Sequence, residues 1–195
     1  DFRGKGLVRG LYLFHYVAPV IAVAFAWVIL FDPFSGSINA LLVQMEVVDT
    51  PINFFGQKPY ALIMVTVFEI WRYFPLSFLF ILARMQAIDV EMYEAADMDG
   101  ASPFQIFWYL SLPTLMGILS ILFLLRFIWT FNKFDDIFLL TGGSADTRTL
   151  TVNVYEQAFA VSNIGAGSAV AVLIFIFLLF FSIFFFRYFN REEGL

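Results

Sequence analysis

Long apolar runs alternate with short polar segments along this 195-residue chain. A helix that crosses a bilayer needs about 20 mostly apolar residues, each adding about 1.5 Å. Four runs meet this requirement, at about residues 11–31, 60–83, 107–131 and 167–186. The pattern therefore predicts an all-α, polytopic bundle of transmembrane helices with four spans in this chain. An even number of spans places both chain ends on the same side of the membrane.

The lysine and arginine residues near the ends of these runs indicate the orientation, because short cytoplasmic loops carry an excess of them. Six lie on the side of the chain ends and three on the opposite side: Arg3, Lys5, Arg9, Arg84, Arg187 and Arg191, against Lys58, Lys133 and Arg148. We therefore expect both chain ends, and the segment between the second and third runs, to lie in the cytoplasm.

That middle segment gathers acidic residues and then returns to apolar sequence, as "EMYEAADMDGASPFQIFWYLSLP" at residues 91–113. Asp89 is a suitable N-cap for a short helix over residues 90–98, and Gly100 supplies the positive φ that ends helices. Ser102, Pro103 and Gln105 then form the pattern of a capping box with proline at the first helical position. The local signals predict a helix, a turn and a second helix that leads directly into a span.

This segment is either a solvated connection between two spans or an element that docks into another protein. A passive connection needs only about 2 to 8 residues, whereas about 23 separate the second and third runs. Ile88, Met92, Tyr93 and Met98 also place buryable side chains among the acids. The length and the amphipathic character favour docking.

Composition narrows the class of protein. Hydrophobic residues make up 61% of the chain and charged residues 14%, as expected for an integral protein of the lipid bilayer. A net charge of −5 argues against a nucleic-acid partner. The chain has no cysteine and one histidine, and it contains neither a HExxH nor a GxSxG pattern; "TGGS" also lacks the Lys-Ser/Thr ending of a phosphate loop. We therefore expect no enzymatic site, no metal and no cofactor.

Several polar residues lie within or beside the apolar runs. Glu69 and Arg72 are three positions apart on one helical face, where they act as an internal brace or contact a solute; a brace is favoured. Arg126 either lines a pathway or extends to the membrane surface.

Three more polar residues have predominantly structural interpretations. His15 is expected to be a packed, hydrogen-bonded residue rather than a ligand. Asp135 and Asp136 are adjacent, so on a helix they point about 100° apart. We expect them to form a solvated cap at the outer end of the third span rather than an acid/base pair.

The stretch "EAADMDGASPFQIFWYLSLP" resembles the EAA motif of permease subunits of binding-protein-dependent ABC importers. That motif reads Glu-Ala-Ala, three residues, Gly, nine residues, an aliphatic residue, one residue, then an aliphatic residue and Pro. The positions that fill it are Glu94, Ala95, Ala96, Gly100, Leu110, Leu112 and Pro113. Leu110 departs from the more usual isoleucine. "FRGKGLVRGLYLFHYVAPVIAVAFAWVILFD", "IWRYFPLSFLFILARMQAI" and "LLTGGSADTRTLTVNVYEQAF" resemble the carbohydrate branch in the same order, so the similarity covers essentially the whole chain.

This resemblance implies a permease of the prokaryotic inner membrane that moves a sugar or related polyol. It implies a six-span subunit, so residues 1–195 are expected to be one permease domain that is incomplete at its N-terminus. The implied partners are a separate ATP-binding subunit that hydrolyses the ATP, a second homologous permease and an extracytoplasmic solute-binding protein. The coupling-helix loop would lie at about residues 86–106, and the coupling residues would be Glu94, Ala95, Ala96, Asp97, Gly100 and Pro113.

Sugars present apolar faces to aromatic rings and hydroxyls to polar groups, so mixed side chains inside the spans are candidates for the solute pathway. These candidates are Trp71, Arg72, Tyr73, Arg126, Trp129 and Asn132. The alternatives are a membrane channel that works without an ATPase and an ABC permease for a non-sugar solute. A channel would conduct without an ATP-binding partner, which distinguishes it from a permease.

Overall fold

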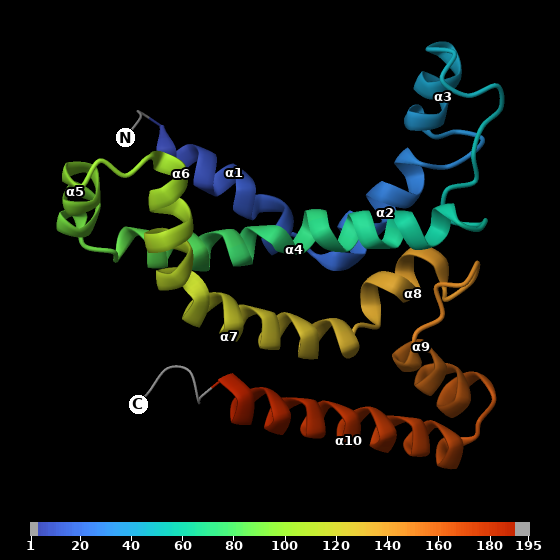
Figure 1. Ribbon diagram of the computed structural model, residues 1–195. Helices are drawn as coiled ribbons and strands as arrows, with labels where there is room; N and C mark the ends of the chain where they lie inside the picture. Colours follow the sequence, from blue (N-terminus) through green and yellow to red (C-terminus); the bar gives the residue numbers. More distant parts are fainter. Residues whose placement is uncertain (1–3, 190–195) are drawn as a thin grey trace. The chain divides into compact units, whose positions relative to one another are not determined.

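The computed structural model describes residues 4–189, and helices dominate this part of the chain (Figure 1). Arg3 and Arg191, which entered the orientation count, lie outside the described residues. The helical elements, in chain order, are α1 (Lys5–Val17), α2 (Val20–Leu30), α3 (Ser37–Gln44), α4 (Tyr60–Gln86), α5 (Val90–Met98), α6 (Pro103–Ile106), the π-helix η1 (Phe107–Ser111), α7 (Leu112–Phe131), α8 (Asp135–Thr141), α9 (Leu150–Tyr155), the π-helix η2 (Glu156–Ala160) and α10 (Ile164–Phe189). No strand occurs within residues 4–189, which confirms the all-α fold.

Three of the four predicted spans are helices long and apolar enough to cross a membrane: α4, the continuous stretch Pro103–Phe131, and α10. The prediction of one uninterrupted helix over residues 11–31 is wrong. This region forms α1 and α2, which meet at an angle of 89°. The cause is Pro19, because proline lacks an N–H group and forces the preceding residue into an extended conformation. Ala18 accordingly has φ −58° and ψ 145°.

The π-helix η1 lies at the entry to the third span, just before Pro113. In a regular α-helix the carbonyl of Tyr109 would accept from residue 113, but proline has no N–H to donate. The chain widens here, and the Leu112 N–H donates to the carbonyl of Phe107, five residues earlier. A π-turn is a usual way of absorbing such an irregularity in a helix.

The described chain divides into two compact units, and α4, α7 and α10 each contribute to both. The first unit contains the chain up to Tyr73 together with Phe131–Phe177. Its core joins α2, α4, α8 and α9 through six buried residues: Ala24, Val65, Phe68, Ile137, Leu140 and Val152. Asn39 of α3 is also buried, and its side-chain amide bonds to the backbone of Phe31, Asp32 and Ile52.

The second unit contains Phe74–Thr130 and the chain from Leu178 onward. Here α7 and α10 meet through phenylalanine rings. The rings of Phe127 and Phe181 stack with centroids 4.0 Å apart, and those of Phe123 and Phe185 lie 6.2 Å apart. Such offset aromatic pairs add about 0.5 to 1.5 kcal/mol beyond the burial of their surface.

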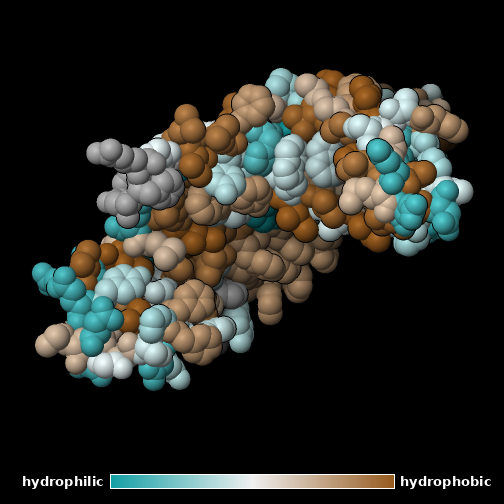
Figure 2. Space-filling model, turned by 90° about the horizontal axis from the view of Figure 1, so that it is seen from above, coloured by the Kyte–Doolittle hydropathy of each residue, from teal (hydrophilic) through white to brown (hydrophobic). Residues whose placement is uncertain are grey.

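Large apolar side chains remain exposed along the spans, and Figure 2 shows apolar residues over much of the visible surface. On α10, Leu173, Phe175 and Phe180 are each at least 64% exposed. In water such a surface would be an aggregation liability, whereas in a bilayer it faces lipid or other apolar helices. The exposed faces therefore agree with a membrane protein.

Candidate functional site

The acidic segment forms a helical hairpin, made of α5, the turn at Gly100, α6 and η1; we call residues 89–111 the acidic hairpin. Its first helix spans Val90–Met98, as predicted. Asp89 occupies the N-cap position with φ −62° and ψ 131°, but its carboxylate makes no capping hydrogen bond. The predicted side-chain cap is therefore wrong. Asp89 and Glu91 still place negative charge at the positive end of the helix dipole.

Gly100 ends α5 in the left-handed conformation, with φ +76°. The N–H of Gly100 donates to the carbonyl of Asp97, and that of Ala101 donates to Ala96, both at 3.0 Å. This pair of bonds is a Schellman motif, which satisfies carbonyls at a helix end. A β-carbon on Gly100 would meet no atom within 4 Å, so the requirement for glycine comes from the backbone conformation rather than from crowding.

The second helix of the hairpin begins with the predicted capping box. The Gln105 amide N–H donates to the Ser102 hydroxyl at 3.3 Å, and the Ser102 N–H donates to the Gln105 side chain at 2.8 Å. Pro103 is at the first helical position. The turn and the box together leave few ways for the hairpin to move relative to the span that it enters.

A hydrogen bond across the hairpin was not foreseen from the sequence. The hydroxyls of Tyr93 on α5 and Ser111 on η1 lie 3.1 Å apart, and Ser111 is only 5% exposed. At the base, Arg84 Nε donates to the carbonyl of Thr114 at 3.3 Å. The signal in the sequence for the Tyr93–Ser111 bond was the presence of a serine within an apolar helix. The Tyr93–Ser111 bond ties α5 to η1, and the Arg84–Thr114 bond ties the end of α4 to the start of α7.

Most of the predicted coupling residues gather on the acidic hairpin. Glu94, Ala95, Asp97 and Gly100 are exposed there and Ala96 is half-buried, whereas Pro113 lies beyond the hairpin in the first turn of α7. Three ion pairs between side chains are found within residues 4–189, and all lie outside the hairpin: Lys58–Asp146, Lys133–Asp136 and Arg148–Glu156. The acids of α5 therefore present their charge to the surroundings.

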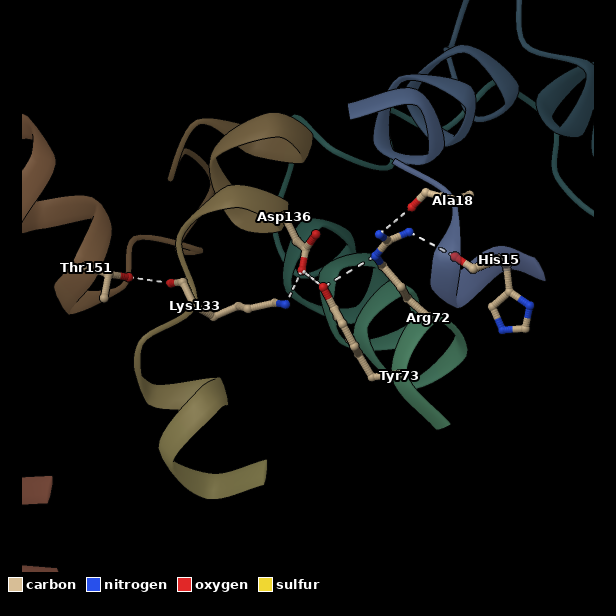
Figure 3. A network of polar contacts seen from close by, with 7 residues as sticks. All are labelled: His15, Ala18, Arg72, Tyr73, Lys133, Asp136 and Thr151. Carbon is tan, nitrogen blue, oxygen red and sulfur yellow. Dashed lines mark hydrogen bonds and ion pairs between the residues drawn. The ribbon is translucent and has the colours of Figure 1, made fainter. Parts of the chain in front are cut away.

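A second group of polar residues forms a buried network in the first unit, with members from α4, the loop after α7, and α8 (Figure 3). The Tyr73 hydroxyl donates to Asp136 Oδ2 at 2.8 Å, and Lys133 Nζ lies 2.7 Å from the same oxygen. Lys133 Nζ also lies 3.6 Å from the centroid of the Tyr73 ring. We call Arg72, Tyr73, Lys133 and Asp136 the buried polar cluster.

Arg72 fastens the bend between α1 and α2. Its guanidinium donates to the carbonyl of His15 at 3.0 Å and to that of Ala18 at 2.8 Å. These carbonyls come from the last turn of α1 and its cap, where intrahelical donors are lacking. Arg72 is 5% exposed, so it acts as an internal brace. The predicted pairing with Glu69 is not what fixes it, since Glu69 lies beside Lys133 and Asp136.

Asp136 differs from the predicted solvated cap, because it is fully buried while Asp135 is exposed. Burial alone would raise the pKa of Asp136, but its contacts with Glu69, Lys133 and Tyr73 outweigh burial and lower that pKa. Burial likewise opposes the charge on Lys133, whose pKa is nevertheless raised by its contacts with Asp136 and Tyr73. The side chains around Asp136 therefore favour a buried ion pair over a carboxylate that is exposed to solvent.

The remaining predicted pathway residues divide between the two units. Trp71 lies in the first unit, where its ring stacks on His15 at 4.4 Å and lies 5.3 Å from Trp27. The Trp71 carbonyl lies 2.8 Å from His15 Nε2, so His15 is packed and hydrogen-bonded, as predicted. Asn132 is an exposed residue of the first unit. In the second unit Arg126 is half-buried and Trp129 is 46% exposed.

Comparison with known proteins agrees with this arrangement. Residues 1–193 match the family described as "Binding-protein-dependent transport system inner membrane component". The inner membrane ABC transporter permease protein YcjO of Escherichia coli is 37% identical over 91% of this chain and 60% of its own length. The trehalose/maltose transport system permease protein MalF of Thermococcus litoralis is 32% identical over 93% of this chain and 61% of its own length. The chain thus spans about 60% of these relatives.

Solved structures show the same fold. The chain superposes with a TM-score of 0.80 and 17% identity on a bacterial ABC transporter involved in the import of the acidic polysaccharide alginate, covering 98% of this chain and 68% of that one. It superposes with a TM-score of 0.81 and 16% identity on a bacterial alginate transporter in complex with a periplasmic protein carrying an alginate pentasaccharide. The match over residues 1–193, together with the arrangement of helices, shows that this chain belongs to the family of binding-protein-dependent transport system inner membrane components.

Proposed function

We propose that the protein is a permease subunit of an ABC importer and that the acidic hairpin couples it to a separate ATP-binding subunit. The main observation behind this proposal is the structure of the hairpin. An exposed acidic helix is joined to a spanning helix by a Schellman turn, a capping box and the Tyr93–Ser111 hydrogen bond. A rigid connection of this kind transmits a displacement of α5 to α7 without absorbing it in a flexible loop.

The charge of the hairpin supports a basic partner surface. Asp89, Glu91, Glu94, Asp97 and Asp99 fall within 11 consecutive positions, and the sequence has no lysine or arginine between Arg84 and Arg126. Complementary charge steers association and excludes wrong partners. Glu94, exposed near the middle of α5, is the residue expected to form an ion pair with the ATP-binding subunit.

The proposed solute is a sugar or related polyol. Relatives of this chain carry names for the transport of trehalose or maltose, trehalose, and sn-glycerol-3-phosphate. The proposed pathway residues are Trp71, Arg72, Tyr73, Arg126, Trp129 and Asn132. Among these, Arg72 and Tyr73 have an additional structural role in the buried polar cluster, so they would shape a pathway rather than bind a solute strongly.

The further partners proposed are a second homologous permease and an extracytoplasmic solute-binding protein. The protein would lie in the inner membrane with the acidic hairpin and both chain ends in the cytoplasm. Because the sequence has no native cysteine, single cysteines at Asp97 and Asp49 can test this orientation in intact cells. A membrane-impermeant maleimide should label the Asp49 position and leave the Asp97 position unlabelled; the reverse pattern would invert the orientation.

The decisive experiment measures uptake of labelled sugars, polyols and glycerol phosphates in cells that lack the gene and carry a full-length copy. Glu94→Lys should abolish uptake without loss of inserted protein, because breaking an interfacial charge pair costs about 2 to 5 kcal/mol. Asp49→Lys, the same charge reversal at an exposed residue outside the hairpin, serves as the control. Charge reversal of the facing basic residue on the ATP-binding subunit should partly restore uptake. Normal uptake by Glu94→Lys would refute coupling through this hairpin.

A further inference from the structure

The acidic hairpin carries an open pocket of about 560 Å³ between α5 and the α6–η1 segment. The α5 side of the pocket is lined by Met92, Ala95, Ala96 and Asp99. These residues follow the spacing of a single helix face. Glu94 is outside this face, so α5 presents an acidic surface in one direction and a face of mostly small side chains in another.

The small side chains along this wall leave the pocket open. Ala95, Ala96, Gly100 and Ala101 all line it, and none has a side chain longer than a methyl group. Three of these residues, together with Leu110 on the opposite wall, are positions of the Glu-Ala-Ala pattern recognised in the sequence. Close packing is the rule inside proteins, so a space between two helices that are tied together by Tyr93 and Ser111 is suited to a side chain from elsewhere.

The chemistry of the lining selects the occupant. The alanine wall and Tyr109 offer apolar surface, and the acidic residue Asp99 also lines the pocket. A lysine or arginine fits this combination, because its aliphatic stem packs on apolar groups while its charged end pairs with an acid. The sequence has no lysine or arginine between Arg84 and Arg126, so the hairpin itself does not supply this cation.

We propose that the pocket receives a basic side chain of the ATP-binding subunit, with its stem against Ala95 and Ala96 and its charge at Asp99. This inference rests on the proposed coupling function and adds a second point of engagement. The outer surface of α5 enters the partner through Glu94, and the partner in turn enters the hairpin. Two interlocked contacts would transmit both a push and a pull, whereas a single contact on the outside of α5 transmits mainly a push.

Thiol protection tests the pocket separately from the coupling function. Single cysteines are placed at Ala101 in the pocket, at Glu94 on the outer face and at Asp49, an exposed residue outside the coupling loop. Each is introduced into the full-length permease, whose residues 1–195 contain no cysteine. Their reaction with a small methanethiosulfonate reagent is followed with and without the cognate ATP-binding subunit. We expect at least about tenfold slower reaction at Ala101 and Glu94 when the subunit is bound, as for interface positions from which water is excluded. The cysteine at Asp49 reports any general change in reactivity.

The outcomes of this test are distinct. Protection at both Ala101 and Glu94 supports the interlocked contact. Protection at Glu94 with an unchanged rate at Ala101 overturns the pocket proposal and leaves the coupling function standing. Absence of protection at both positions overturns the pocket proposal and the coupling function together.

A filled pocket provides the second test. Ala96→Leu adds three carbons on the pocket face of α5 and keeps a good helix former, whereas Ala40→Leu makes the same change at an exposed position of α3 that does not line the pocket. We expect Ala96→Leu to weaken binding of the ATP-binding subunit by about tenfold or more, since an excluded anchor side chain is costly. The thermal midpoint of the isolated permease checks that the variant remains folded. Equal affinity of Ala96→Leu and Ala40→Leu would show that nothing enters the pocket.

Discussion

The acidic hairpin and the buried polar cluster use charge in opposite ways. The carboxylates of α5 are exposed and none of the ion pairs of residues 4–189 reaches them. Asp136, by contrast, is fully buried and bonded to Tyr73 and Lys133. Charges satisfied within the chain hold the fold, while charges that the chain leaves exposed beside small apolar side chains are available to a partner. The two regions therefore separate residues that stabilise the fold from residues that are available for the proposed coupling.

The strongest test of this separation removes the cation from the buried polar cluster. Lys133→Met leaves the Asp136 carboxylate buried without its ion pair, which typically costs about 3 to 5 kcal/mol. Lys58→Met makes the same change in the Lys58–Asp146 pair, whose side chains are 62% and 67% exposed, and should cost less than about 1 kcal/mol. Thermal unfolding of the purified protein in detergent measures both. Equal losses would mean that burial does not distinguish the two pairs.

Removal of the Arg72 brace at the bend between α1 and α2 is expected to have the next largest effect on stability. Arg72→Met removes the donors to the carbonyls of His15 and Ala18 and should cost about 2 to 3 kcal/mol, as for hydrogen bonds made by a charged group. Arg148→Met, at a half-exposed arginine paired with Glu156, is the control and should cost less than about 1 kcal/mol. If Arg72→Met unfolds at the same temperature as the control, the bend is held by packing alone.

The turn of the acidic hairpin should show a smaller and local effect. Gly100→Ala forces a β-carbon into the left-handed region and costs about 1 to 2 kcal/mol, although space for the methyl group is free. Hydrogen exchange of the α5 amides should quicken accordingly, with exchange in α10 unchanged. Gly165→Ala, near the start of α10 where the added carbon would make ordinary contacts, should be neutral or stabilising. Unaltered exchange in α5 would show that another conformation of the turn is equally accessible.

Loss of the hydrogen bond across the hairpin should have a smaller effect again on stability. Tyr93→Phe removes one hydroxyl and should cost about 0.5 to 1.5 kcal/mol, which loosens α5 from η1 without changing the charge of the hairpin. Tyr109→Phe, at a residue that is 82% exposed, should leave exchange of the α5 amides as in the unmodified chain. An uptake assay adds the functional reading, since a looser hairpin should transport at a lower rate per ATP hydrolysed. Identical exchange in the two variants would show that this bond does not contribute to the rigidity of the hairpin.

Much of the hairpin could be predicted from the sequence because its signals are local. The left-handed turn at Gly100 and the capping box from Ser102 to Gln105 depend on neighbours within a few positions, and the structure confirms both. The capping bond expected of Asp89 is missing, since a residue suited to an N-cap does not have to direct its side chain to the helix. The length of α5 was nevertheless predicted correctly.

The buried polar cluster could not be predicted in the same way, since its partners come from distant positions. Tyr73 and Asp136 are 63 positions apart, and Arg72 bonds to carbonyls 54 and 57 positions away. A hydropathy pattern registers Asp136 as polar and suggests solvent, whereas its burial follows from the packing of α8 on α2 and from its bonds to Tyr73 and Lys133. The bend had a local signal in Pro19 itself. The prediction missed it because the apolar run around this proline is long enough for one span.

The turn after α2 offers a third use of charge and the most subtle prediction. Asp32 is half-buried, unlike the exposed acids of α5, and its carboxylate accepts from the N–H groups of Phe34 and Ser35 at 2.9 and 2.8 Å and from the Ser35 hydroxyl at 3.0 Å. The bonds from the backbone of Ser35 and Phe34 lower the pKa of Asp32 below its usual 3.8. Because the folded pKa is the lower one, ionised Asp32 stabilises the turn above pH 3.8 and the contribution is lost as the pH falls through the lowered pKa. The amide proton shifts of Phe34 and Ser35 in NMR spectra should therefore titrate with a midpoint below the usual pKa of 3.8, and Asp32→Asn should abolish the change. A transition at or above the usual pKa would place Asp32 with the carboxylates that the chain leaves for a partner.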